Sequence, residues 1–177
     1  MYVWVAVDVD EQVRELREST EHYVKNIGSS SPTFTLPFHI SLKISFNIPD
    51  DIINEAIGDI VELCGSLNPF PISVKDIEQN GPIVWITMQE SKELEHIHNR
   101  LDELVLKKYG VLQHAFDKAF IFHTSLVIMD DEEQARLALD TIKKTSIPKT
   151  LIAKKIIIGT SLEGKPGTYS INEEIDI

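Results

Sequence analysis

The sequence predicts an α/β (α+β) fold built as two similar lobes, and two observations carry this prediction. A unit of strand, helix, strand, helix and strand appears twice along the 177 residues. Local details recur with it, because Val3-Trp4-Val5 opens the first unit and Val84-Trp85-Ile86 opens the second. We therefore expect one domain, residues 1–177, with pseudo-repeats over about 1–80 and 82–177 that are related by an approximate two-fold axis.

The first half begins with a β-rich apolar run, YVWVAVDV, which predicts a strand at 2–9. Apolar residues at near-helical spacing after the capping candidate Asp10 predict a helix at 11–26, and GSSSP predicts a loop. Three further elements are expected: a long strand at 33–48 with Pro37 marking an edge or bulge, a helix from Pro49 to about Leu67, and a strand at 69–81.

The second half is entered through an Asn80-Gly81 turn, which predicts that 82–89 pairs with the preceding strand as a hairpin. The same order of elements then follows. We expect a strand and a helix within 83–110, a strand at 115–129, a helix at 130–144, a strand at 150–161 and a final strand around 168–175 after the turn at 163–167.

Composition excludes several functional classes. Seventeen Lys and Arg against 28 Asp and Glu give a net charge of -11, which disfavours extended, sequence-independent binding to nucleic acid or to anionic lipid. No apolar run approaches the roughly 18 residues of a membrane span. The single Cys64 cannot form an internal disulfide, and the start MYVWVAVD does not read as a signal peptide, so we expect a cytoplasmic protein without a membrane partner.

One short frame, Phe-His-x-Ser-Leu, occurs twice in the chain. Residues 38–42 read FHISL and residues 122–126 read FHTSL, so the frame places His39 and His123 at matching points of the two units. The apolar positions of both frames would anchor each strand in the core: Phe38, Leu42, Phe122 and Leu126. The polar positions are then free to line a groove between the lobes.

Strand alternation decides which polar side chains share a face. His39, Ser41 and Lys43 lie at every second position and should point to one side of their strand, and the same rule groups His123 with Ser125. If the two lobes are related by a two-fold axis, both polar faces meet in one cleft. The frame therefore predicts a site made of two histidines and two serine hydroxyls, with one lysine beside them.

Such a site suits hydrolysis or transfer at a phosphodiester. One neutral histidine takes a proton from the attacking hydroxyl or water, and the other histidine, protonated, gives one to the leaving oxygen. Imidazole has an ordinary pKa near 6.5, so both forms exist at cellular pH. Ser41 and Ser125 would donate to the non-bridging oxygens and Lys43 would supply a local cation, so the scheme needs no metal and no cofactor.

The paired motifs His39-Ile40-Ser41-Leu42 and His123-Thr124-Ser125-Leu126 resemble those of the 2H phosphoesterase superfamily, in particular its bacterial 2′-5′ RNA ligase-like, cyclic phosphodiesterase branch. The resemblance covers nearly the whole chain. It implies a bilobal fold in which two antiparallel sheets line a central cleft with helices outside. It also implies that both histidines are catalytic and that both motif hydroxyls bind phosphate. Substrates of relatives include 2′,3′-cyclic phosphates, ADP-ribose cyclic phosphate and 2′-5′ linked RNA.

The chain departs from this family pattern after the second motif. Many relatives carry a basic residue there, whereas Val127, Ile128 and Met129 follow here, and the only nearby cation follows the first motif as Lys43. This asymmetry predicts that charge holds the phosphate from one side. It leaves the preferred substrate open between a nucleotide and an RNA end, and it leaves the oligomeric state open as well.

Plainer interpretations exist for each of these residues. His39 and His123 can be strand histidines bonded to the backbone, the two serines can be ordinary sheet residues, and Lys43 can extend away from any cleft. Trp4 and Trp85 are either platforms for a base or core residues. The remaining histidines include His96 and His98, which lie two apart on a helix and so cannot form a helical metal pair; we expect them to be solvated.

Three functions remain in competition at this stage. The first is a metal-independent phosphodiesterase acting on 2′,3′-cyclic phosphate or 2′-5′ linkages of RNA or nucleotides, reversible as an RNA ligase. The second is a module that uses the same cleft to bind a nucleotide or RNA end without turnover. The third is a histidine-based metal hydrolase, which lacks a third ligand at any recognisable spacing.

Overall fold

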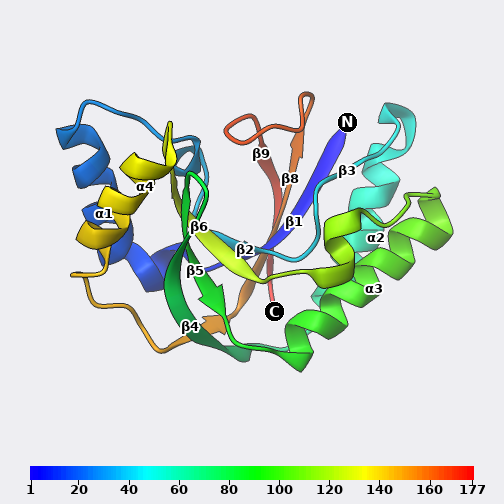
Figure 1. Ribbon diagram of the computed structural model, residues 1–177. Helices are drawn as coiled ribbons and strands as arrows, with labels where there is room; N and C mark the ends of the chain where they lie inside the picture. Colours follow the sequence, from blue (N-terminus) through cyan, green and yellow to red (C-terminus); the bar gives the residue numbers. More distant parts are fainter.

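The computed structural model describes residues 1–177 and contains two antiparallel sheets with helices outside them, as expected (Figure 1). The first sheet has the strand order β2-β1-β8-β9, and β3 also pairs with β1. Its strands are β1 (Tyr2–Asp8), β2 (His39–Ser41), β3 (Phe46–Asn47), β8 (Lys155–Ser161) and β9 (Ser170–Asp176). The second sheet has the order β6-β5-β4-β7 and is made of β4 (Phe70–Asn80), β5 (Ile83–Met88), β6 (His123–Ile128) and β7 (Thr150–Ala153).

Four α-helices cover the outer faces of the sheets: α1 (Arg14–Asn26), α2 (Ile53–Gly65), α3 (Lys92–Tyr109) and α4 (Glu132–Ile142). Helices α1 and α4 pack together beside the second sheet, whereas α2 packs against β9 and α3 (Figure 1). Short 3-10 turns complete the chain: η1 (Asp10–Val13), η2 (Pro32–Thr35), η3 (Asp50–Ile52) and η4 (Ala115–Ala119). No helix has the length and apolar character needed to cross a membrane.

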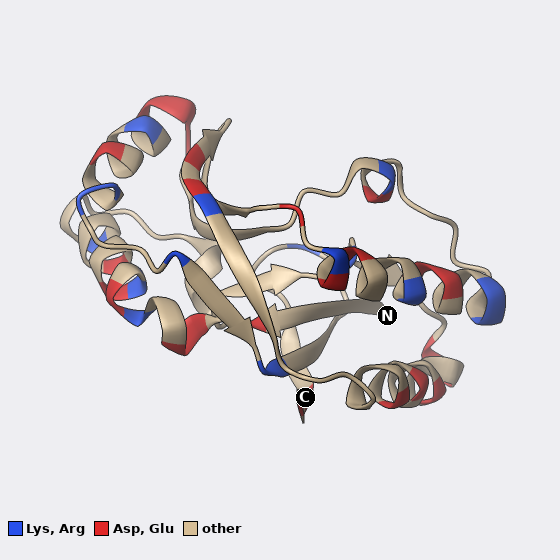
Figure 2. Ribbon diagram, turned by 90° about the horizontal axis from the view of Figure 1, so that it is seen from below, with Lys and Arg blue, Asp and Glu red and all other residues tan.

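Helix ends follow ordinary capping chemistry. The Ser91 side chain accepts a hydrogen bond from the Leu94 amide at the start of α3, and Asp131 accepts from the Gln134 amide at the start of α4. Helix α3 ends at Gly110, whose φ of 69° is in the left-handed region that glycine adopts without strain. Most of the charged residues are on the outer helices, whereas the strands consist mostly of uncharged residues (Figure 2).

Strand β1 is buried on both faces and shows how the core is divided. Val3, Val5 and Val7 belong to a main core of 38 residues that is continuous across the two halves of the chain. On the opposite face, Trp4 and Ala6 form a small cluster with Ile157 of β8. The main core holds the sheets and helices together. The small cluster lies on the opposite face of β1, where Trp4 borders the cleft that is described below.

Two expected long strands are each interrupted. The segment 33–48 forms η2, the short strand β2 and, after a break, β3, because Pro32 begins a turn that the Ser31 side chain caps. The segment 115–129 likewise forms η4 before β6. In both segments a 3-10 turn precedes the motif histidine, so each histidine lies where the chain enters its strand.

The strand expected at 150–161 is two strands in different sheets. Strand β7 pairs with β4, and after Lys154 the chain crosses to the first sheet, where β8 pairs with β1 and β9. Strand β4, from the end of the first predicted repeat, lies in the second sheet. Each sheet therefore draws strands from both halves of the sequence, and the repeat boundary at residues 80–82 stays a prediction.

Candidate active site

The two motif histidines lie on edge strands that meet at the centre of the molecule. His39 begins β2 at the edge of the first sheet, and His123 begins β6 at the edge of the second sheet. The two edge strands lie side by side (Figure 1), and the hydroxyl of Thr124 donates a hydrogen bond of 2.7 Å to the carbonyl of His39. Because Thr124 follows His123 directly in the chain, this bond links the two histidine motifs.

Both imidazole rings are held in the same way. The Nδ1 atom of His39 lies 2.8 Å from the carbonyl of Pro37, and Nδ1 of His123 lies 2.7 Å from the carbonyl of Ile121. A carbonyl oxygen only accepts, so Nδ1 carries the proton in each ring. Each neutral ring therefore keeps an unprotonated Nε2, which is the atom that general base chemistry needs.

A tryptophan packs against each of these rings. The rings of Trp4 and His39 are 4.4 Å apart between centroids, and those of Trp85 and His123 are also 4.4 Å apart. The indole of Trp4 donates to the Ser41 hydroxyl at 3.3 Å, whereas the indole nitrogen of Trp85 is buried without a partner. Both tryptophans thus pack against the motif histidines; Trp4 is buried, whereas Trp85 is half-buried.

The histidines and serines of both motifs line one cleft of about 300 Å³. Ser41 and Ser125 lie there beside His39 and His123, so the structure brings together the four residues that strand alternation grouped. The cleft also contains residues that sequence reasoning missed, from η2 and from the turn between β8 and β9: Pro32, Thr33, Leu36, Gly164, Pro166, Gly167 and Tyr169.

Tyr169 is the most informative of these missed residues. It lines the cleft together with Ser45, its ring lies 6.1 Å from that of Trp4, and its buried hydroxyl makes no hydrogen bond of ordinary geometry within the protein. A buried hydroxyl without a partner is costly unless another molecule satisfies it. The only sequence signal was its place just after a glycine-rich turn, which does not indicate that the turn folds back over the cleft.

Burial lowers the pKa of both motif histidines. The pKa of His39 falls to about 4, and burial is the largest cause; the Pro37 carbonyl raises it, a positive charge on His123 lowers it, and Asp10 raises it. Burial also lowers the pKa of His123, and the Ile121 carbonyl opposes this effect. In the free protein near neutral pH both rings are therefore predominantly neutral.

Lys43 does not offer the free cation that strand alternation predicted. Its side chain is 2% exposed, and its ammonium is paired with the carboxylates of Asp102 and Asp117, the latter at 3.0 Å. The reason is that β2 ends at Ser41, so alternation no longer holds at Lys43. Lys43 borders the cleft, but its charge is already neutralised there, and no other lining residue is Lys or Arg.

His98 also differs from expectation, because it is buried rather than solvated. It lies on the inner face of α3 beside Asp102 and Asp117, and His96 is exposed on the same helix. His98, Asp102 and Asp117 have ligand atoms within 4.8 Å of one another, a spacing that a metal ion can use. The ammonium of Lys43 is paired with both carboxylates, in the place that a metal ion would take, so the residues do not fit a metal site.

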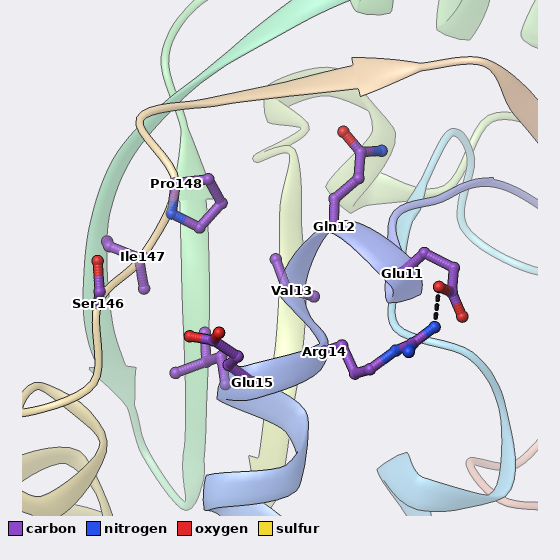
Figure 3. A pocket seen from close by; sticks show the side chains of 9 residues that line it. Glu11, Gln12, Val13, Arg14, Glu15, Ser146, Ile147 and Pro148 are labelled. Carbon is purple, nitrogen blue, oxygen red and sulfur yellow. Dashed lines mark hydrogen bonds and ion pairs between the residues drawn. The ribbon is translucent and has the colours of Figure 1, made fainter.

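A larger hollow of about 580 Å³ lies elsewhere, between the start of α1 and the segment that precedes β7. Figure 3 shows its lining, in which Arg14 is already paired with Glu11 and Glu15 lies nearby. Its lining contains no histidine, cysteine or lysine. Volume alone therefore does not mark a functional site, and the candidate catalytic residues line the smaller cleft.

Solved structures of similar fold cover almost the whole chain. TT0787 of Thermus thermophilus is 16% identical with a TM-score of 0.67, and the match covers 99% of this chain and 97% of that one. Escherichia coli LigT in complex with 3′-AMP is 16% identical with a TM-score of 0.60, covering 99% and 96% of the two chains. A structure described as a phosphoesterase is 17% identical with a TM-score of 0.58, covering 99% and 97%.

At such low identity these structures establish the fold, which agrees with the two-sheet architecture described above. No curated protein matches the sequence. The family itself is shown by the sequence model of the 2′-5′ RNA ligase superfamily, which matches residues 5–164 and so includes both histidine motifs. The chain therefore belongs to the 2′-5′ RNA ligase superfamily of 2H phosphoesterases.

Proposed function

We propose that the protein is a metal-independent phosphodiesterase that acts on 2′,3′-cyclic phosphates or 2′-5′ linkages of nucleotides or RNA ends. The observation that carries this proposal is the matched pair of histidines. His39 and His123 face one cleft, each is oriented by a carbonyl two residues before it, and each has a serine two residues after it. Two equivalent imidazoles beside a cleft suit a reaction that takes one proton and gives another.

We assign His39 as the proton acceptor and His123 as the proton donor in the hydrolytic direction. The pKa of His39 is lowered strongly, to about 4, so this ring stays neutral, whereas the lowering at His123 is not large. His39 takes a proton from the attacking water, and His123 gives one to the leaving ribose oxygen. The reverse sequence forms the ester, so ligation at the same site follows from microscopic reversibility.

The cleft is suited to a phosphate that carries a single negative charge. Ser41 and Ser125 supply neutral donors, and a protonated His123 supplies one positive charge. Lys43 is already neutralised by two carboxylates, so a doubly charged monoester gains no second cation. A phosphodiester or cyclic phosphate, which has one charge, is therefore favoured over its monoester product, and this difference aids product release.

The dimensions and charge of the molecule support a small substrate. A volume of about 300 Å³ is at the lower end of ligand pockets, which hold roughly 300 to 1,000 Å³, and it suits one nucleotide or the end of an RNA. The net charge of -11 disfavours a long duplex. Structures of the similar Escherichia coli LigT are described in complex with 3′-AMP and with ATP, which supports nucleotide binding at this fold. We place the protein in the cytoplasm, in line with its single cysteine.

A substrate panel tests this proposal. Nucleoside 2′,3′-cyclic phosphates and 2′-5′ dinucleotides are incubated with chelator, and products are separated by chromatography. The expected result is turnover of at least one class that is lost in His39→Asn but kept in His96→Asn, because His96 is exposed on α3 away from the cleft. Turnover that depends on added metal, or that survives in His39→Asn, would contradict the mechanism.

A substrate with a good leaving group distinguishes the roles of the two histidines. A substrate that releases p-nitrophenolate needs little help from an acid, so the rate of His123→Asn should recover toward that of the natural chain on this substrate. His39→Asn should remain slow, because the attack still needs a base. The opposite pattern would exchange the two roles.

One alternative keeps the same cleft but removes turnover, so that the protein only binds a nucleotide or RNA end. The partnerless hydroxyl of Tyr169 favours a bound ligand of some kind and does not distinguish the two functions. Calorimetry that shows tight binding of a cyclic nucleotide, together with its intact recovery after long incubation, would favour the binding module. Recovery of the opened monoester would favour the enzyme.

A further inference from the structure

A buried cluster of four ionisable side chains lies behind the cleft and contacts both histidine motifs. It consists of Lys43, His98, Asp102 and Asp117, which are 13% exposed or less. The ammonium of Lys43 is bonded to both carboxylates, and Nε2 of His98 lies 3.6 Å from a carboxylate oxygen of Asp102. Neither His98 nor the two aspartates have a part in the proposed chemistry, so the cluster needs a separate explanation.

The cluster holds the end of the first motif. Nδ1 of His98 lies 2.7 Å from the carbonyl of Leu42, the last residue of the FHISL frame. The carboxylate of Asp117 accepts from the Ile44 amide at 3.3 Å, one residue beyond Lys43. The backbone on both sides of Lys43 is therefore held from α3 and η4, in addition to the bond of 2.8 Å that the Leu42 amide donates to the Val5 carbonyl of β1.

The same imidazole packs against the entry to the second motif. The ring of His98 stacks on that of Phe120 at 4.7 Å between centroids and meets the edge of Phe122 at 6.1 Å. These residues flank Ile121, whose carbonyl orients His123. A single buried side chain on α3 thus contacts the segment that leaves one motif and the segment that enters the other.

Both ring nitrogens of His98 lie within hydrogen-bonding distance of a carbonyl oxygen. Nδ1 faces the carbonyl of Leu42, and Nε2 faces the carbonyl of Asp117 at 3.2 Å. Both partners can only accept, and a neutral imidazole has a single N–H, so both bonds exist together only in the imidazolium form. The cluster then contains two cations, Lys43 and His98, and two anions, Asp102 and Asp117. This balance explains how four charges are buried together.

We propose that His98 is a positioning residue, held as the doubly protonated imidazolium, which fixes the two histidine motifs relative to each other. It touches neither the substrate nor the reacting atoms. It acts through the Leu42 carbonyl on one side and through Phe120 and Phe122 on the other, so its loss shifts the two catalytic rings out of alignment. The catalytic part of this inference rests on the proposed function, and the protonation of His98 does not.

The first test needs no activity. Nitrogen NMR of the histidine-labelled protein at about pH 7 should show that both ring nitrogens of one histidine carry protons, and this signal should be absent in His98→Asn. His96, exposed on the same helix, is the internal control for an imidazole in contact with solvent. A single protonated nitrogen on His98 at this pH would overturn the assignment.

The second test uses three substitutions that retain different parts of the imidazole. His98→Phe keeps the stacking but loses both hydrogen bonds. His98→Asn places an amide near Nδ1 and can still donate to Leu42, whereas His98→Gln places it near Nε2, toward Asp117. We expect kcat per folded molecule to fall about 10- to 100-fold in His98→Phe, the scale of a small misplacement, with KM little changed. His98→Asn should recover more than His98→Gln.

A purely structural role predicts a different result. In that case the three variants lower the unfolding midpoint, but kcat corrected for the folded fraction stays at the level of the natural chain, and the proposal is overturned. If His98→Phe does not fold, the comparison of Asn with Gln decides, and equal kcat values would overturn it. If the natural chain turns over no substrate of the panel, the proposed function fails, while the NMR result still tests the buried imidazolium.

Discussion

The replacement of His39 by Asn should change how the stability of the protein depends on pH. Asn can keep the hydrogen bond to the Pro37 carbonyl but cannot be protonated. Burial lowers the pKa of His39 from its ordinary 6.5 to about 4 in the folded state. Below about pH 6.5 the unfolded chain therefore binds a proton that the folded chain does not bind until the pH approaches 4, so stability is lost as the pH falls through this window.

The magnitude follows from the two pKa values. Between about pH 7 and about pH 5 the difference in proton binding at His39 costs about 2 kcal/mol of unfolding free energy. His39→Asn lacks this contribution, so it should lose about 2 kcal/mol less than the natural chain over the same interval. Other groups, including His123, titrate in both proteins, so their contributions to the change in unfolding free energy cancel in the comparison.

Urea unfolding followed by circular dichroism at the two pH values measures this difference directly. The His96→Asn variant is the control, since His96 is exposed on α3 and should behave as the natural chain does. Equal losses of stability in the natural chain and in His39→Asn would refute the reasoning, because they would mean that burial does not keep a proton from His39.

Three further predictions concern the phosphate and the buried cluster. Ser41→Ala and Ser125→Ala should each lower kcat/KM by about 10- to 100-fold, the scale of a lost bond to an anion; initial rates within about twofold of the natural chain would exclude such bonds. Orthophosphate binding should take up about one proton near neutral pH, because an anion raises the lowered pKa values of the motif histidines. Calorimetry in two buffers of different ionisation enthalpy checks this, and equal heats would contradict it. Lys43→Met leaves Asp102 and Asp117 buried without their cation and should cost about 3–5 kcal/mol in urea unfolding; an unchanged midpoint would show that the carboxylates are not held as anions.

The order of strands and helices follows from hydrophobic periodicity, and the structure confirms it for most elements. Strand β1 and helix α1 occur close to the expected ranges 2–9 and 11–26. In each of them the apolar residues follow one continuous periodic pattern, which predicts the element from the sequence alone. The partners of the strands do not follow from local pattern. The chain crosses between sheets at Lys154, inside a run that alternates well enough to predict one strand, since only the tertiary arrangement distinguishes the two sheets.

The candidate site shows the same limit. Alternation placed His39 with Ser41, and His123 with Ser125, because these residues are within their strands. It failed at Lys43, which lies beyond the end of β2 and is attracted by carboxylates 59 and 74 positions away. Spacing did put His96 and His98 on different sides of α3. His98 is buried against the Leu42 carbonyl, 56 positions away, and no local pattern encodes that contact.

The central claim is that both motif histidines move protons in one reaction without a metal. Phosphorus NMR of a nucleoside 2′,3′-cyclic phosphate, in the presence of chelator, measures it most directly for the natural chain, His39→Asn and His123→Asn. We expect the natural chain to open the cyclic phosphate and each variant to be about 100- to 10,000-fold slower, the scale of a lost acid or base. Rates in both variants that match the natural chain, or activity that chelator abolishes, would contradict it.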